Sequence, residues 1–285
     1  MADLDAVLAD LRSEGDALEL LVADLAAARW RTPTPAAGWT IAHQIAHLAW
    51  TDAISCLAAT EPARFQQELE RAIADVDGYV DTAAADGARQ PPSELLVRWH
   101  DGRTALLAAL AAVPPGTRLP WFGPPMSPTS MATARIMETW AHGQDIADAL
   151  RLPCEPSARL RHVAHLGVRT RDFAYLVNAR TPPAEAFRVE LSGPRGESWT
   201  WGPPDAPQRV TGPALDFCLL VTQRRHRAEL ALHVAGHDAD EWLDIAQAFA
   251  GPPGAGRPAP PPEPDRATSG RPTRVNVARS GGEGS

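Results

Sequence analysis

Two pairs of polar side chains lie four residues apart in stretches with helical character. The stretch "WTIAHQIAHLAW", residues 39–50, contains His43 and His47, and "METWAHGQDIADAL", residues 137–150, contains Glu138 and His142. Four residues are about one helical turn, so the members of each pair should project from the same side of their helix. Imidazole nitrogens and a carboxylate oxygen are ligands that zinc accepts, and three such ligands would leave a position open for water or substrate. The spacing therefore predicts a candidate metal centre that uses one or both histidines of the first stretch with Glu138 and His142.

The same residues also fit an ordinary helical core. A histidine on an apolar helix face is often a core residue with its hydrogen bonds satisfied, and a Glu-x-x-x-His pair can be a simple contact along one helix. Gln44, Thr51 and Ser55 are expected on the outward face of the first helix, opposite the histidines. Spacing alone leaves both interpretations open.

Composition excludes several classes of function. The chain has 285 residues and a net charge of -8, which argues against a nucleic-acid partner, and all 27 basic residues are arginine. Without lysine, neither Schiff-base catalysis nor a Walker-type phosphate loop is available. The three cysteines, Cys56, Cys154 and Cys218, form no CxxC motif and indicate no disulfide framework. The sequence contains no signal-peptide pattern and no long apolar run, so we expect a cytoplasmic protein that binds no membrane. We also expect a monomer or homodimer that acts on a small molecule.

Apolar periodicity and turn residues predict a mainly α fold. Helices are expected in "LDAVLADLRSEGDALELLVADLAAARW", from about Thr40, around "ARFQQELERAIADV", in "PPSELLVRWHDGRTALLAALAAV", from Ser127, and over about 157–178. Residues 1–180 therefore suggest an antiparallel four-helix bundle. Residues 183–253 suggest a small α+β domain, with strands in "FRVELSG" and "ESWTWG" and two further helices. The composition of residues 254–285 predicts a disordered tail that packs against nothing.

The stretches "GWTIAHQIAHL" and "ETWAHGQDIADAL" resemble the two metal-binding helices of the DinB-like family, in its mycothiol-dependent maleylpyruvate isomerase branch. The resemblance implies a DinB-like bundle with His47, Glu138 and His142 as metal ligands, whereas His43 matches a histidine that is not a usual ligand. It implies zinc, or another divalent metal such as nickel, and mycothiol as a cofactor. Asp145 or His43 is expected to orient a ligand histidine.

"VTGPALDFCLLVTQRRH" is similar to the C-terminal segment of the same family, which ends in an arginine important for activity. That arginine falls on Arg224, with Arg225 beside it, and the resemblance implies catalytic and cofactor-binding roles there. Two interpretations of these arginines stay open. They form either a solvated helix end that complements the dipole, or a clamp for a carboxylate of the thiol or substrate.

The expected function is that of a metal-dependent isomerase or S-transferase that uses a low-molecular-weight thiol. In such a reaction a metal-activated thiolate attacks an electrophilic carbon. One alternative keeps the metal without a thiol, as in a hydrolase or cyclase of a secondary metabolite. Another is a non-catalytic protein that binds a small molecule.

Overall fold

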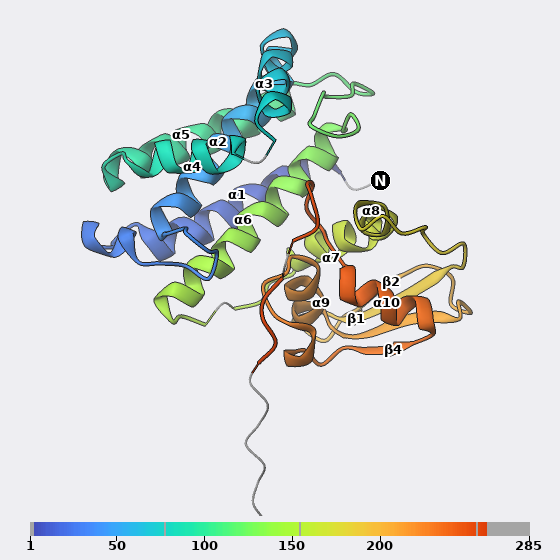
Figure 1. Cartoon of the computed structure of the whole chain (residues 1–285). Helices are drawn as coiled ribbons and strands as arrows, with labels where there is room; N and C mark the ends of the chain where they lie inside the picture. The colour runs from blue at the N-terminus through green and yellow to red at the C-terminus, as the bar shows by residue number, and fades with distance from the viewer. Residues whose placement is uncertain (1–2, 77, 154, 255, 261–285) are drawn as a thin grey trace, which may run out of the picture.

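The computed structural model describes residues 3–76, 78–153, 155–254 and 256–260. These residues form a mainly helical structure with one small sheet (Figure 1), which confirms the predicted fold class. The helices are α1 Leu4–Val22, η1 Ala27–Arg31, α2 Ile41–Thr60, α3 Pro62–Ala74, α4 Tyr79–Ala88, α5 Pro92–Ala111, α6 Pro128–Leu150, α7 Leu160–Arg169, α8 Arg171–Val177, α9 Ala214–Val221, η2 Arg227–Glu229 and α10 His237–Ile245.

Helices α1, α2, α5 and α6 form the bundle that carries the two polar pairs. Helix α6 begins as predicted, because the Ser127 side chain accepts a hydrogen bond from the Ser130 backbone N–H at 3.1 Å and Pro128 occupies the first turn. Helix α2 begins after Thr40, whose backbone N–H donates to Nδ1 of His43 at 3.3 Å. Capping contacts therefore fix the starts of both helices that carry the candidate ligands.

The prediction that Gln44, Thr51 and Ser55 lie on an outward face is wrong. All three are buried, and the Gln44 and Ser55 residues have no exposed surface. The reason is that α2 packs against α5, α4, α6 and α3, so it has no solvent face along most of its length. Their polar groups are instead satisfied inside the bundle, as for Thr51, whose hydroxyl donates to the His47 carbonyl at 2.9 Å.

The sheet has four strands in the order β2-β1-β3-β4: β1 Phe187–Ser192, β2 Ser198–Trp201, β3 Gln208–Pro213 and β4 His233–Ala235. Strands β1 and β2 are the predicted pair, and they run antiparallel. Strand β3 lies parallel to β1 and antiparallel to β4. Strands β3 and β4 were not predicted, because β4 is only three residues long and β3 ends in Gly-Pro.

Three helical regions differ from their predictions. Helix α1 ends at Val22, earlier than expected, and α4 was not predicted. The helix expected over 157–178 is broken at Thr170, whose hydroxyl lies 3.0 Å from the Leu166 carbonyl and 2.6 Å from the Gln247 carbonyl. Thr170 thereby ties the break between α7 and α8 to the chain that follows α10.

Helices α7 and α8 share a hydrophobic core with the sheet, α9 and α10. Leu160 and Val163 of α7 and Tyr175 of α8 belong to the same buried cluster as Phe217 and Trp242. Met137 and Trp140 of α6 extend this cluster into the bundle. The division at residue 180 stays a prediction, but the packing joins the two parts of the chain through α6 and α7.

The described part of the C-terminal segment contacts the bundle. The Arg257 guanidinium forms an ion pair with Asp145 on α6, and the Asp145 side chain is only 1% exposed. The expectation that the tail packs against nothing is therefore wrong at Arg257, while residues 255 and 261–285 of the predicted disordered tail lie outside the described residues.

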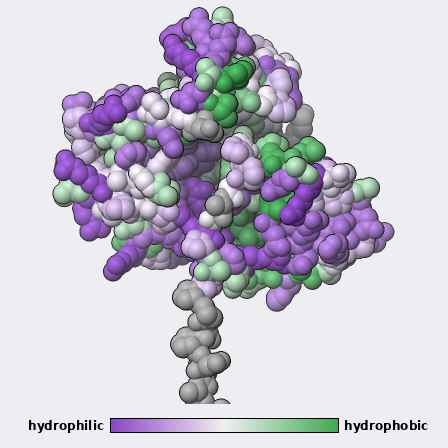
Figure 2. All heavy atoms as spheres, in the orientation of Figure 1, coloured by the Kyte–Doolittle hydropathy of each residue, from purple (hydrophilic) through white to green (hydrophobic). Residues whose placement is uncertain are grey.

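Within the described residues, no helix combines the length and the hydrophobicity needed to cross a membrane. Hydrophilic residues cover most of the face in Figure 2, and hydrophobic residues occupy smaller patches on it.

Candidate metal centre

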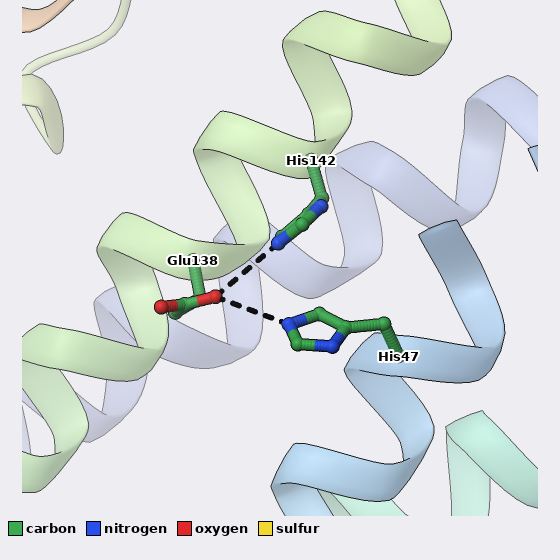
Figure 3. A group of neighbouring side chains, drawn as sticks. All are labelled: His47, Glu138 and His142. Atoms are coloured by element: carbon green, nitrogen blue, oxygen red, sulfur yellow. Dashed lines mark hydrogen bonds and ion pairs between the residues drawn. The ribbon is translucent and has the colours of Figure 1, made fainter. Parts of the chain in front are cut away.

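His47 from α2 and the pair Glu138 and His142 from α6 point toward one another (Figure 3). Oε2 of Glu138 lies 3.4 Å from Nε2 of His47 and 3.2 Å from Nε2 of His142. The potential ligand atoms of the three residues all lie within 4.8 Å of one another. The structure thus brings His47, one member of the first pair, together with both members of the second pair, of which Glu138 lies 91 residues later in the chain.

The cluster is largely shielded from solvent. The His47, His142 and Glu138 side chains are 9%, 12% and 24% exposed. Burial acts to raise the pKa of Glu138, but the adjacent imidazoles of His142 and His47 outweigh it and hold that pKa well below its usual value. Burial, and then the neighbouring His47, lower the pKa of His142 to about 4 although Glu138 opposes the shift. At neutral pH the cluster therefore contains a carboxylate and at least one neutral imidazole.

Tryptophan rings cover one side of the cluster. The Trp39 ring stacks on His142, with centroids 6.0 Å apart and an interplanar angle of 16°, and its centroid is 5.3 Å from that of His47. Trp50 contacts His47 from the next turn of α2, at a centroid distance of 5.9 Å. These ring contacts restrict the orientations of both imidazoles.

Gln44 contacts His142 at Nδ1, the ring nitrogen that does not face Glu138, and this role was not predicted from the sequence. Its Oε1 lies 2.5 Å from Nδ1 of His142, and its Nε2 donates to Oγ1 of Thr34 at 2.9 Å. The signal available in the sequence was its position, three residues before His47, which places it on the same side of α2.

His43 and Asp145, the residues expected to orient a ligand, have other partners. Nδ1 of His43 lies 2.8 Å from Oγ1 of Thr40, so His43 serves the N-terminal cap of α2. Asp145 is bound by Arg224, at 3.0 Å between Nη2 and Oδ2, and by Arg257.

Arg224 lies next to the cluster, whereas Arg225 is tied to the helix farther along. Besides Asp145, Arg224 donates from Nε to the carbonyl of Ala141, the residue before His142, at 3.2 Å. Arg225 makes a two-point contact with Asp148, with distances of 2.6 and 2.7 Å. The two arginines thus bind successive turns of α6.

Comparison with known proteins yields two family models. Residues 11–147 match the mycothiol maleylpyruvate isomerase N-terminal domain, and residues 183–233 match the model described as wyosine base formation. The first match spans both candidate ligand helices, and the second spans β1, β2, β3 and α9.

Two solved structures share this fold. A crystal structure of the mycothiol-dependent maleylpyruvate isomerase aligns with a TM-score of 0.53 and 16% identity, covering 79% of this chain and 90% of that one. A mutant of a protein with the same description aligns with a TM-score of 0.56 and 14% identity, covering 81% of this chain and 93% of the other. At this identity the likeness establishes the fold alone.

Two sequence relatives are much closer. The uncharacterized protein Rv0036c of Mycobacterium tuberculosis strain ATCC 25618 / H37Rv and the uncharacterized protein MT0041 of strain CDC 1551 / Oshkosh are each 58% identical over 257 residues, covering 90% of this chain and 100% of each relative. The chain therefore belongs to one family with these mycobacterial proteins, and its residues 11–147 match the model of the mycothiol maleylpyruvate isomerase N-terminal domain.

Proposed function

We propose that this protein is a metal-dependent enzyme in which His47, Glu138 and His142 hold one divalent cation, zinc in the first place. The observation that carries the proposal is the spacing of the ligand atoms. Zinc bonds of about 2.0–2.1 Å at tetrahedral angles place neighbouring ligand atoms roughly 3.3–3.4 Å apart. The separations of 3.4 and 3.2 Å between Glu138 Oε2 and the two imidazole nitrogens fit that spacing with little adjustment.

The electrostatics of the cluster support the same assignment. A carboxylate held ionised and a histidine held neutral are the protonation states that metal ligands require. In the orientation described, Gln44 Oε1 faces Nδ1 of His142, so the proton of this imidazole belongs on Nδ1. Its Nε2 then presents a lone pair to Oε2 of Glu138 at 3.2 Å. Two acceptors face each other there, and a cation between them would satisfy both.

The reaction we propose is a thiol-dependent isomerisation or thiol transfer, with mycothiol as the thiol because of the family match over residues 11–147. A divalent cation held by His47, Glu138 and His142 would lower the pKa of a thiol bound beside it. In the isomerisation, sulfur adds to one carbon of a conjugated cis double bond and the carbonyl accepts the displaced electron pair. Rotation about the resulting single bond and loss of the same sulfur restore the double bond in trans form, and the thiol is released unchanged.

Arg224 is the residue we assign to an anionic group of the substrate or thiol. Its Nε, Nη1 and Nη2 already contact Ala141, Thr222 and Asp145. A guanidinium carries five N–H groups, so two stay available for a carboxylate. Both terminal nitrogens of Arg225 are bound to Asp148, which makes Arg225 the weaker candidate.

Metal analysis followed by thiol titration tests the proposal. The purified protein should contain one divalent metal per chain, and Glu138→Gln should lose it while the variant stays folded by circular dichroism. In the cobalt-substituted protein, mycothiol should shift the visible absorption bands, and mycothiol should be required for turnover of maleylpyruvate.

Three results would overturn parts of the proposal. A wild-type protein that binds no metal at saturating zinc or nickel would refute the metal centre. A metal that binds without any spectral response to mycothiol would refute the thiol and leave activation of water as the function. A thiol response without turnover of maleylpyruvate would refute that substrate and leave thiol transfer to another electrophile.

A further inference from the structure

A chain of hydrogen bonds leads from the back of His142 into the loop that precedes α2. The Thr34 hydroxyl donates to the carbonyl of Trp39 at 3.0 Å, and the same carbonyl accepts from the Thr34 backbone N–H at 2.8 Å. Nε2 of Gln44 donates to Oγ1 of Thr34 at 2.9 Å, and Oε1 of Gln44 lies 2.5 Å from Nδ1 of His142. The chain therefore begins at a backbone carbonyl, which can only accept, and ends at a candidate metal ligand.

The direction of each bond follows from this starting point. A carbonyl oxygen has two lone pairs, so Trp39 can accept from both the amide and the hydroxyl of Thr34. With its proton directed to Trp39, the Thr34 oxygen is an acceptor and takes the amide N–H of Gln44. The amide oxygen of Gln44 must then face His142, which places the imidazole proton on Nδ1 and leaves Nε2 free.

From this chain we infer that Gln44 and Thr34 are positioning residues that select the metal-ligating tautomer of His142. The inference rests on the proposed metal centre. Turning the Gln44 amide over would place its N–H groups toward Nδ1 and the imidazole proton on Nε2, where it would block the ligand position. That arrangement also requires the Thr34 hydroxyl to leave the Trp39 carbonyl, so the loop favours the ligating form.

Burial makes the Gln44 contact difficult to replace by solvent. Gln44 has no exposed surface and the His142 side chain is 12% exposed. His47 differs, because its Nδ1 is buried and has no hydrogen-bond partner among the described residues. Of the two candidate ligand histidines, His142 is thus the one whose Nδ1 has a hydrogen-bond partner among the described residues.

Four variants test the inference through zinc affinity, measured by competition with a chromophoric chelator. Gln44→Leu removes the acceptor and should weaken zinc binding about 10–100-fold, the usual cost of losing a hydrogen-bond partner of a ligand. Gln44→Glu keeps an acceptor oxygen at Nδ1 and should bind zinc with at least the wild-type affinity. Thr34→Val should weaken binding in the same direction by a smaller factor. Ser55→Ala is the matched control, because Ser55 is also fully buried on α2 but its hydroxyl donates to the Thr51 carbonyl.

The tautomer itself is read by two-bond 1H–15N correlation spectra of the imidazoles, with and without zinc. The zinc-bound wild type should show His142 protonated on Nδ1, and Thr34→Val should show a mixture of tautomers in the metal-free protein. Wild-type zinc affinity in Gln44→Leu, or a wild-type protein whose His142 ligates through Nδ1, would overturn the inference even though the metal centre stands. A wild type that binds no zinc would refute the metal centre instead, so the two failures are distinguishable.

Discussion

His142 and His43 each lie one turn from another candidate ligand, yet their environments predict opposite consequences of removal. His142→Ala deletes one of the three proposed ligands, and we expect it to abolish stoichiometric metal binding. His43→Ala deletes a side chain that contacts Thr40 at the start of α2, so metal should still bind at saturation. Loss of the capping contact should cost about 1 kcal/mol of unfolding free energy. Inductively coupled plasma analysis and thermal unfolding of both variants measure the two effects.

The reverse ranking would make His43 the ligand on α2 and would exclude His142 as a ligand. Equal and negligible losses of metal in both variants would exclude the centre as drawn in Figure 3.

At the scale of elements, a buried ion pair fixes α2 against α6 close to the candidate ligands. Nε of Arg135 donates to Oδ1 of Asp52 at 2.9 Å, and both side chains are 2% exposed. Removing one partner leaves a buried charge uncompensated, so Asp52→Asn or Arg135→Met should lower the unfolding free energy by about 3–5 kcal/mol. The double variant Asp52→Leu/Arg135→Met leaves no buried charge and should lose much less. Urea denaturation of the three variants gives the comparison, and a double variant as unstable as either single one would contradict this account.

The contact between α7 and α9 depends on the absence of a side chain at Gly167. A Cβ atom there would lie 2.8 Å from Cγ2 of Val221. Gly167→Ala should therefore lower the unfolding free energy by about 1–3 kcal/mol through overpacking. Gly102 in α5 is the control, because a Cβ atom there meets nothing within 4 Å, and Gly102→Ala should stabilise by up to about 1 kcal/mol. Thermal unfolding distinguishes them, and similar melting temperatures for both variants would refute the packing argument.

At the scale of the whole molecule, the C-terminal segment is tied to the bundle through Arg257 and Asp145. A chain that ends after residue 260 keeps this ion pair, and its melting temperature should stay within about 2 °C of the full chain, since about 1 kcal/mol corresponds to a few degrees at this size. Arg257→Ala in that shorter chain removes a charged partner of a buried carboxylate and should lower the melting temperature by several degrees, or about 1.5–3 kcal/mol. Differential scanning calorimetry of both chains measures this. An unchanged melting temperature in Arg257→Ala would show that Arg224 alone satisfies Asp145.

The sequence by itself determined the mainly α class, the starts of α2 and α6, and the two pairs of polar residues. These features depend on local rules: apolar periodicity, capping residues and the four-residue turn. The choice of His47, Glu138 and His142 as candidate metal ligands depended in addition on the family resemblance, and their convergence required the packing of α2 against α6. Only the tertiary structure decided that Gln44 is buried behind His142, because α2 is enclosed by several helices and the loop with Thr34 folds back onto it. It also decided that Arg224 and Arg257 share Asp145, since their contact joins residues more than 70 positions apart, which no local pattern encodes.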